Sequence, residues 1–324
     1  MINATFDLLD FLRSNFSFLF ALALYTLLAI TLSKSIKTHY RAYYWLFGVI
    51  SFCFIIPVSA RLLGLTLPFN LGQIPLVGVA ASELSSAANF IHPILVIIMY
   101  MGALSAKNKY VGRLMSIRKE LSIIVGFPVL AHVVKRLFGT FPGGWQYFFD
   151  NETYMQNPRV TSALGSGITS FAFVLGLAMT ILFLVLWITS FDSVHRKLGT
   201  KRWKGIQRWS YGLYAMLFIH SLCLQVGGMI SDDARAREQE IQKTKVEVVD
   251  STQGAAAAHK APAQGAQAKS SGHSHGPRNF SLESVEISKS TIRWVNIFSY
   301  LLIYGSYLYL RLRKARKSKR RAEA

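Results

Sequence analysis

Residues 164–191 form an apolar run that contains no charged side chain, and similar runs recur along the chain. A helix crosses the hydrocarbon core of a bilayer with ~20 apolar residues, whereas a soluble enzyme alternates short apolar and polar stretches. The sequence therefore predicts an all-α fold, a polytopic membrane helical bundle. We expect about seven transmembrane helices, at residues 16–33, 43–65, 85–106, 120–139, 164–191, 208–230 and 292–310.

Most of the charge lies in the gaps between these runs, and it is strongly positive, with a net charge of +20. Lysine and arginine gather in the first, third and fifth gaps and at the C-terminus, while the second and fourth gaps hold Glu83, Asp150 and Glu152. Cytoplasmic loops of membrane proteins are enriched in Lys and Arg. We therefore expect an integral protein of a bacterial plasma (inner) membrane, in contact with lipid, with the N-terminus outside and the C-terminus in the cytoplasm. The membrane then explains the basic charge, and no nucleic acid partner is expected.

The expected helices divide the chain into five parts. These are two N-terminal transmembrane helices (1–84), a central core (85–230), an extracytoplasmic low-complexity loop (231–291), the last transmembrane helix (292–310) and a basic cytoplasmic tail (311–324). Within the loop, residues 231–250 form a short helix or extend the helix before them. The Ala-, Gly- and Ser-rich stretch after them is expected to be disordered, because it cannot bury a core. His273 and His275 in this loop bind a metal weakly or are incidental to a flexible tether.

The predicted helices contain three histidines, His92, His132 and His220. At 1.5 Å per residue, His132 and His220 both lie ~18 Å from the cytoplasmic ends of their helices, and His92 lies ~10 Å from the outer end of its own. An ionisable side chain is costly in hydrocarbon and often functional. Two imidazoles at one depth on two helices suit bis-histidine haem ligation. For any single histidine, a hydrogen bond to a neighbouring backbone or hydroxyl group is the alternative.

Cations near the outer ends of two helices could neutralise the propionates of a haem. Lys135 and Arg136 follow His132 at i+3 and i+4, on the same face of the helix. Arg61 lies near the outer end of the second helix. These three cations depart from the positive-inside pattern, and propionate binding would explain them. Snorkelling of the long side chains to the interface is the alternative.

Two stretches of the core end in the depth-matched histidines: RKELSIIVGFPVLAH (Arg118 to His132) and LGTKRWKGIQRWSYGLYAMLFIH (Leu198 to His220). The first resembles a helix of the ferric-reductase-like transmembrane domain family. The second is similar to the run of LG, RW, R, Y and a final H in the haem-binding membrane subunit of the periplasmic methionine sulfoxide reductase system. The similarity covers roughly residues 85–225. It implies a four-helix core holding haem b, with His132 and His220 as axial ligands of the iron, and electron transfer across the membrane.

The chain departs from the family's pattern at two positions. Members with two haems have a second histidine pair nearer the cytoplasm, where this chain has Arg118 and Gln207. The resemblance therefore implies one haem b. His92 could replace either axial ligand or contact a propionate. Arg118 and Gln207 could line a polar site for a quinone or a flavoprotein, or simply lie at the membrane interface.

The sequence shows no glycine-rich nucleotide-binding motif. The electrons are therefore expected from a separate donor, either a membrane quinol or the flavin of a cytoplasmic flavin reductase. We expect the electron-transfer subunit of an oxidoreductase, which passes electrons to an extracytoplasmic redox protein. A bis-histidine haem has no open coordination position, which favours electron relay over chemistry at the iron.

Two other function classes fit the same sequence. A membrane transporter or channel uses intramembrane histidines for protons or metal ions. Pro57, Pro93 and Pro128 interrupt expected helices, as they do in such proteins, although no internal repeat is evident. A purely structural membrane anchor is the third interpretation.

Overall fold

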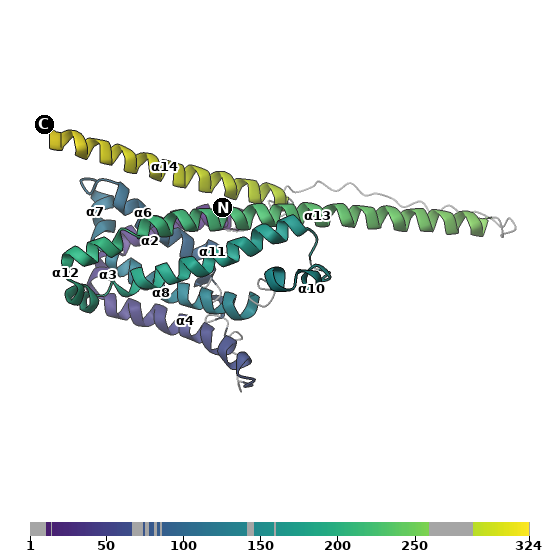
Figure 1. The fold of residues 1–324 in the computed structure, drawn as a ribbon, viewed down its shortest axis with the longest axis horizontal. Coiled ribbons are helices and arrows are strands. Elements are labelled where there is room, and N and C mark those ends of the chain that lie inside the picture. Colours follow the sequence, from purple (N-terminus) through teal and green to yellow (C-terminus); the bar gives the residue numbers. More distant parts are fainter. Residues whose placement is uncertain are drawn as a thin grey trace, which may run out of the picture.

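The computed structural model describes residues 11–13, 15–66, 74, 78–80, 83–84, 86–140, 146–158, 160–258 and 288–323. All regular structure in these ranges is helical, and none of it is a β-strand. The predicted all-α fold is therefore confirmed. The long helices lie side by side in an elongated bundle (Figure 1).

A helix is present at each of the seven predicted positions. These are α2 (Ser17–Thr31), α4 (Tyr40–Leu62), α6 (His92–Ala103) after the π-helical turn η2 (Ala87–Ile91), α8 (Arg118–Lys135) before the π-helical turn η3 (Arg136–Thr140), α11 (Ala163–Ile188), α13 (Ser210–Ala258) and α14 (Lys289–Glu323). Within the described residues, shorter helices also occupy gaps that were expected to be loops: α3 (Ser33–Thr38), α7 (Lys109–Ser116), α10 (Asn151–Met155) and α12 (Asp192–Gln207).

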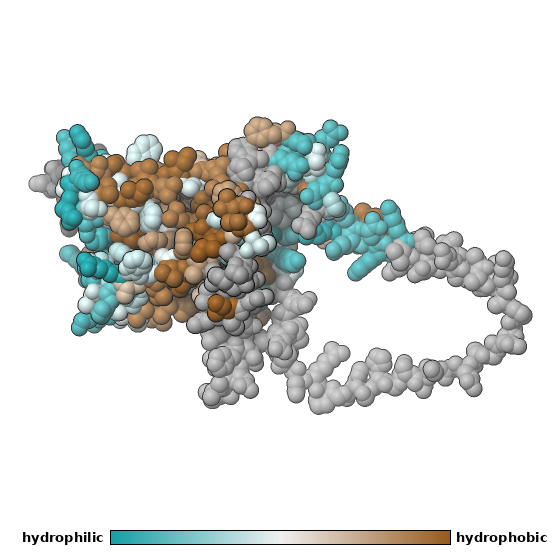
Figure 2. All heavy atoms as spheres, turned by 90° about the horizontal axis from the view of Figure 1, so that it is seen from below, coloured by the Kyte–Doolittle hydropathy of each residue, from teal (hydrophilic) through white to brown (hydrophobic). Residues whose placement is uncertain are grey.

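Four segments of the described chain are helical, long and apolar enough to cross a membrane. They are Tyr40–Ala60, Arg118–Phe138, Ala163–Ile188 and Ser210–Lys245, while Ser17–Thr31 and Asn89–Ala103 are apolar but shorter. Figure 2 shows the corresponding surface on one face of the bundle, a broad apolar region with hydrophilic side chains at both of its ends. The chain is therefore an integral membrane protein by the length and composition of these helices. A count of seven spans stays a prediction.

The two ends of the bundle differ in composition. We call the end that holds α3, α7, α12 and the last turns of α14 the basic end, and the end that holds α10 and the projecting part of α13 the arm end (Figure 1). Exposed cations such as Arg196, Lys201 and Arg202 on α12 lie at the basic end. The predicted clustering of positive charge therefore corresponds to one end of the structure.

Two helices run further than expected. The sequence predicted ends at residues 230 and 310, but α13 continues to Ala258 and α14 to Glu323. The added residues are rich in Ala, Glu, Gln, Lys and Arg, which are strong helix formers. Extension of the earlier helix was thus the correct alternative for residues 231–250, and disorder was the wrong expectation for residues 251–258. Residues 259–287, which include His273 and His275, lie outside the described part of the chain.

Packed helix pairs form a closed ring in the middle of the bundle. Helix α6 packs on α8, α8 on α11, α11 on α13, α13 on α14, and α14 on α6, while α4 packs outside the ring against α8. The closest approach joins α11 and α13, where a Cβ added to Gly165 or Gly227 would lie 2.8 Å from the carbonyl oxygen of the other glycine. Small residues permit such backbone contact between membrane helices.

Candidate functional site

The imidazole of His220 is oriented by α11. Its Nδ1 atom lies 2.7 Å from the carbonyl oxygen of Ala172. Because a carbonyl oxygen can only accept, Nδ1 carries the proton and Nε2 keeps its lone pair. A Cβ on Gly176, one turn along α11, would lie 3.3 Å from Cε1 of this ring. Helix α11 thus fixes the tautomer of His220 and leaves space for its ring, which is the usual arrangement of a metal-ligating histidine.

His132 lies in the last turn of α8 and is half-buried. In the ring of packed helices, α8 and α13 are the two neighbours of α11, and both pack against it. Arg136, at the start of η3, lies close enough to His220 to act on it electrostatically. The arm-end parts of α8 and α13 therefore face a common region. Joint ligation by His132 and His220 stays a prediction.

His92 occupies a different environment. It is 4% exposed, and its two nitrogens lie 2.9 Å from the Tyr304 hydroxyl and 3.4 Å from the Ser221 hydroxyl. The rings of Phe18 and Tyr300 pack on it, with centroids 4.8 and 5.0 Å away. Both nitrogens thus have hydrogen-bonding neighbours, and a role of His92 at the cofactor stays a prediction.

The structure describes the side chains of two of the three predicted propionate-binding cations. The Lys135 ammonium lies 5.3 Å from the centre of the Phe54 ring on α4, outside the ring of helices. Arg136 is exposed and faces the region of His220. The side chain of Arg61 lies outside the described part of the structure. Propionate binding by any of the three cations stays a prediction.

The donor set near His220 fits a haem better than a metal ion held by protein alone. In the described ranges, no three His, Cys, Asp or Glu side chains cluster to hold a metal ion. A haem needs only axial ligands from the protein, because the porphyrin supplies the other nitrogens. The lone pair on Nε2 of His220 is a donor of the kind that one axial position needs. Haem binding between His132 and His220 stays a prediction.

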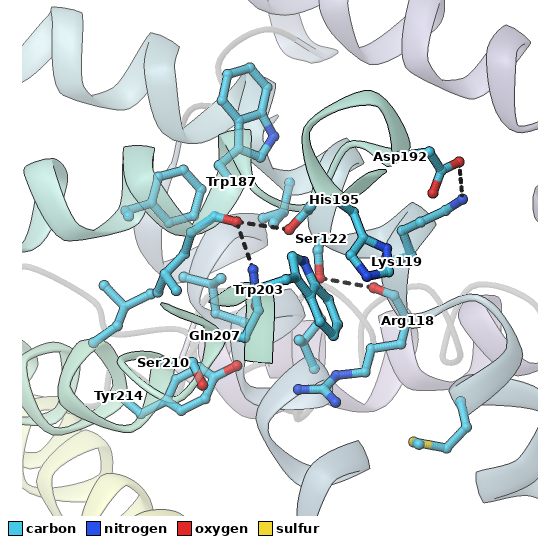
Figure 3. Close-up of a pocket in the computed structure, with 18 residues that line it drawn as sticks. Arg118, Lys119, Ser122, Trp187, Asp192, His195, Trp203, Gln207, Ser210 and Tyr214 are labelled. Atoms are coloured by element: carbon cyan, nitrogen blue, oxygen red, sulfur yellow. Dashed lines mark hydrogen bonds and ion pairs between the residues drawn. The ribbon is translucent and has the colours of Figure 1, made fainter. Parts of the chain in front are cut away.

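A cavity of about 370 Å³ lies at the basic end of the same bundle (Figure 3). Side chains of α6, α7, α8, α11, α12 and α13 line it, and many are aromatic or polar. The lining residues with polar or aromatic side chains include Arg118, Lys119, Ser122, Phe183, Trp187, Ser190, Asp192, His195, Trp203, Gln207, Ser210 and Tyr214. The structure thus brings Arg118 and Gln207 to one cavity, at the positions where two-haem relatives were expected to have histidines.

Several of these side chains are held by hydrogen bonds to the end of α11. Nε2 of Gln207 donates to the Thr189 hydroxyl at 2.9 Å and to the Leu186 carbonyl at 3.3 Å, and Nε1 of Trp203 donates to the Thr189 carbonyl at 2.8 Å. The amide oxygen of Gln207 is left as an acceptor. Arg118 supplies positive charge from α8 (Figure 3). The cavity therefore offers a cation, an acceptor and flat aromatic surfaces.

An ion pair crosses the rim of the cavity. Nζ of Lys119 lies 2.9 Å from Oδ2 of Asp192, and the side chains are 40% and 59% exposed. The hydrogen bond from Lys119 holds the pKa of Asp192 below its ordinary value. Beside it, the buried Glu120 carboxylate accepts from Nζ of Lys37 at 2.8 Å, which ties α8 to α3. Helices α3, α8 and α12 are thus linked by charge at the basic end.

The sequence did not identify His195, Trp187 or Asp192 as residues of a site. Asp192 and His195 lie in α12, a stretch that was expected to be a loop because its charges mark it as polar, whereas Trp187 lies near the end of the predicted helix α11. The sequence pattern that could have identified α12 is the alternation of Val194, Leu198 and Trp203 with cations, which is typical of an amphipathic helix at an interface. That helix forms the floor of the cavity.

Comparisons with known proteins give one weak similarity and no function. No family model matches the chain, and no solved structure matches it significantly. An uncharacterized protein of Treponema pallidum (strain Nichols) is 28% identical over 110 residues. The matched region covers 33% of this chain and 26% of that protein, so the chain matches only about a quarter of its relative's length.

Proposed function

We propose that this chain is a b-type haem membrane protein that relays electrons from a donor at its basic end to a redox protein at its arm end. The basic end would face the cytoplasm, in accordance with the enrichment of Lys and Arg in cytoplasmic segments. The donor would be a quinol or a cytoplasmic flavoprotein, and the acceptor an extracytoplasmic redox protein. The resemblance of residues 85–225 to the ferric-reductase-like family supports the same function.

One observation carries the proposal, the environment of His220. Its Nδ1 proton is donated to Ala172, which orients Nε2 away from that carbonyl, and Gly176 leaves room for the ring. His132, on the other side of α11, would be the second ligand.

The chain's own residues would hold the cofactor and keep it dry. His132 and His220 would bind the iron, and Arg136 would neutralise a propionate. Bound there, haem b supplies one-electron redox chemistry. The buried cluster of His92, Tyr304 and their aromatic neighbours packs against α13 next to His220 and excludes water from that side. A low-dielectric environment of this kind helps to set the redox potential of a haem.

The visible spectrum of the purified protein tests the proposal. Protein from haem-replete cells should show a Soret band and reduced α and β bands. His132→Ala and His220→Ala should each abolish them. His92→Phe, which keeps an aromatic ring in the buried cluster, is the matched control and should retain the haem with at most a shifted potential.

The result that would overturn the proposal is a folded, monodisperse protein without haem bands. Retention of full haem content by both His132→Ala and His220→Ala would also overturn the ligand assignment. The spectrum separates this function from a transporter or channel as well, since neither requires a chromophore.

A further inference from the structure

Packed helices form the side walls of the basic-end cavity. These walls come from α6, α8, α11 and α13, and neighbouring members of the helix ring pack on one another, with α14 completing the ring between α13 and α6. The remaining boundary is α12, which lies across the basic end and contributes Asp192, His195, Trp203 and Gln207 to the lining.

The two halves of α12 are held very differently. The half after Gly199 is bound to α11 through the hydrogen bonds that Trp203 and Gln207 donate. The half before it, residues 192–198, is held by the exposed pair between Asp192 and Lys119 and by the ring of His195, whose centroid lies 4.5 Å from that of Trp203 in the second half. None of the residues of α12 is fully buried. The first half is therefore the weakest part of the cavity wall.

Gly199 separates these halves. Its backbone has φ 71° and ψ 155°, so the helix is broken there. Residues with a Cβ rarely adopt this conformation, and glycine adopts it freely. No other atom lies within 4 Å of the place a Cβ would occupy, so the break is surrounded by open space. The position has the properties of a hinge.

The charges around this wall favour anions. Arg118 lines the cavity, and Lys119 lies at its rim. The one carboxylate in the cavity lining, that of Asp192, is paired with Lys119. If this pair separates, the ammonium of Lys119 becomes available to a second anion at the entrance.

We propose that residues 192–198 are a cover that opens at Gly199 and admits a water-soluble, negatively charged donor group from the cytoplasm. This inference rests on the proposed function and deepens it, because it names the route and the charge of the electron donor and excludes entry of a quinol from the bilayer. The pair between Lys119 and Asp192 holds the cover closed.

The test measures access to a single thiol inside the cavity. Ser122→Cys is introduced into a chain with Cys53→Ala and Cys223→Ala, and the protein is placed in lipid nanodiscs. Three reagents are compared: the anion methanethiosulfonate ethylsulfonate, its cationic trimethylammonium analogue, and the lipid-soluble N-phenylmaleimide. Each rate, followed by intact mass, is normalised to the rate with a free thiol.

The anionic reagent should react faster than the cationic one. An exposed ion pair contributes ~0.2–1 kcal/mol, so Asp192→Asn should raise the open fraction, and with it the anionic labelling rate, by about 1.4- to 5-fold. The double variant Asp192→Asn/Lys119→Gln should have the same open fraction as either single variant, because each single substitution already removes the whole ion pair. Lys204→Gln, which removes an exposed cation from the second half of α12, is the matched control and should leave the rate unchanged.

Two outcomes overturn the inference. In the first, N-phenylmaleimide labels the thiol at a rate independent of Asp192→Asn while both charged reagents fail, which would mean entry from the bilayer. In the second, the charged reagents label it equally fast in the parent and the Asp192→Asn protein. Neither readout involves haem, so failure of the haem spectrum would overturn the proposed function and leave these rates interpretable.

Discussion

Gly126→Ala should destabilise the protein through a clash with Trp187. Gly126 is buried in α8, and a Cβ added there would overlap the indole of Trp187, whose Nε1 donates to the Ile123 carbonyl at 3.1 Å. Overpacking costs about 1–3 kcal/mol, and loss of the hydrogen bond costs about 0.5–1.5 kcal/mol. Alanine regains about 0.5–1 kcal/mol of helix stability over glycine. The net loss should be about 2 kcal/mol in the free energy of unfolding.

Denaturant titration of the purified protein in detergent measures this loss. Gly305→Ala in α14 is the matched control, because nothing lies within 4 Å of its added Cβ, and it should be neutral or stabilising. In a Trp187→Ala background, Gly126→Ala should no longer be harmful. An equal loss in that background would show that the indole is not the cause and would refute the reasoning.

Three further changes have expected outcomes. Gly176→Ala should compress the His220 ring, and it should lower haem content or shift the reduced α band, as read from pyridine haemochrome and visible spectra. Asp192 has a lowered pKa, so its pairing stabilises the fold above about pH 4, the ordinary range of aspartate, and this contribution disappears as the pH falls through the lowered pKa. The free energies of unfolding of the parent and of Asp192→Asn should therefore differ by a few tenths of a kcal/mol at pH 7 and become equal in acid. Lys37→Met leaves the buried Glu120 carboxylate without its close donor and should cost about 1–3 kcal/mol by denaturant titration, while Lys34→Met should cost little.

The long helices were predictable because one physical requirement dominates them. A run of ~20 apolar residues has few folds open to it other than a helix in a membrane. The amphipathic helices at the basic end were missed for the opposite reason. In α12, residues such as Arg196 and Lys201 dominate the composition, and the apolar side chains that face the bundle are few. Their pattern was visible, but charge alone was taken to indicate a loop.

The candidate site was predictable in part. Histidines in an apolar run are conspicuous, so His220 could be selected from its surroundings. Its neighbours Ala172 and Gly176 could not be selected from the sequence, because small residues are common in this apolar run. Only the packing of α11 on α13 shows that these two residues contact His220. The same holds for Gly199 and Trp203, which belong to the stretch that carried the family resemblance. The structure gives these two residues separate roles, a break in α12 and a wall of the cavity.

The unbroken length of α13 has a mechanical consequence. One helix, Ser210–Ala258, begins at the wall of the cavity, carries His220 in its third turn and ends in the projecting arm, with a length of roughly 70 Å at 1.5 Å per residue. Backbone contact at Gly227 fastens this helix to α11. If a protein bound to the arm rotated it about the helix axis, the rotation would be transmitted along α13 toward His220. The interior of the bundle and the projecting arm are therefore connected by one continuous helix, which Gly227 holds against α11.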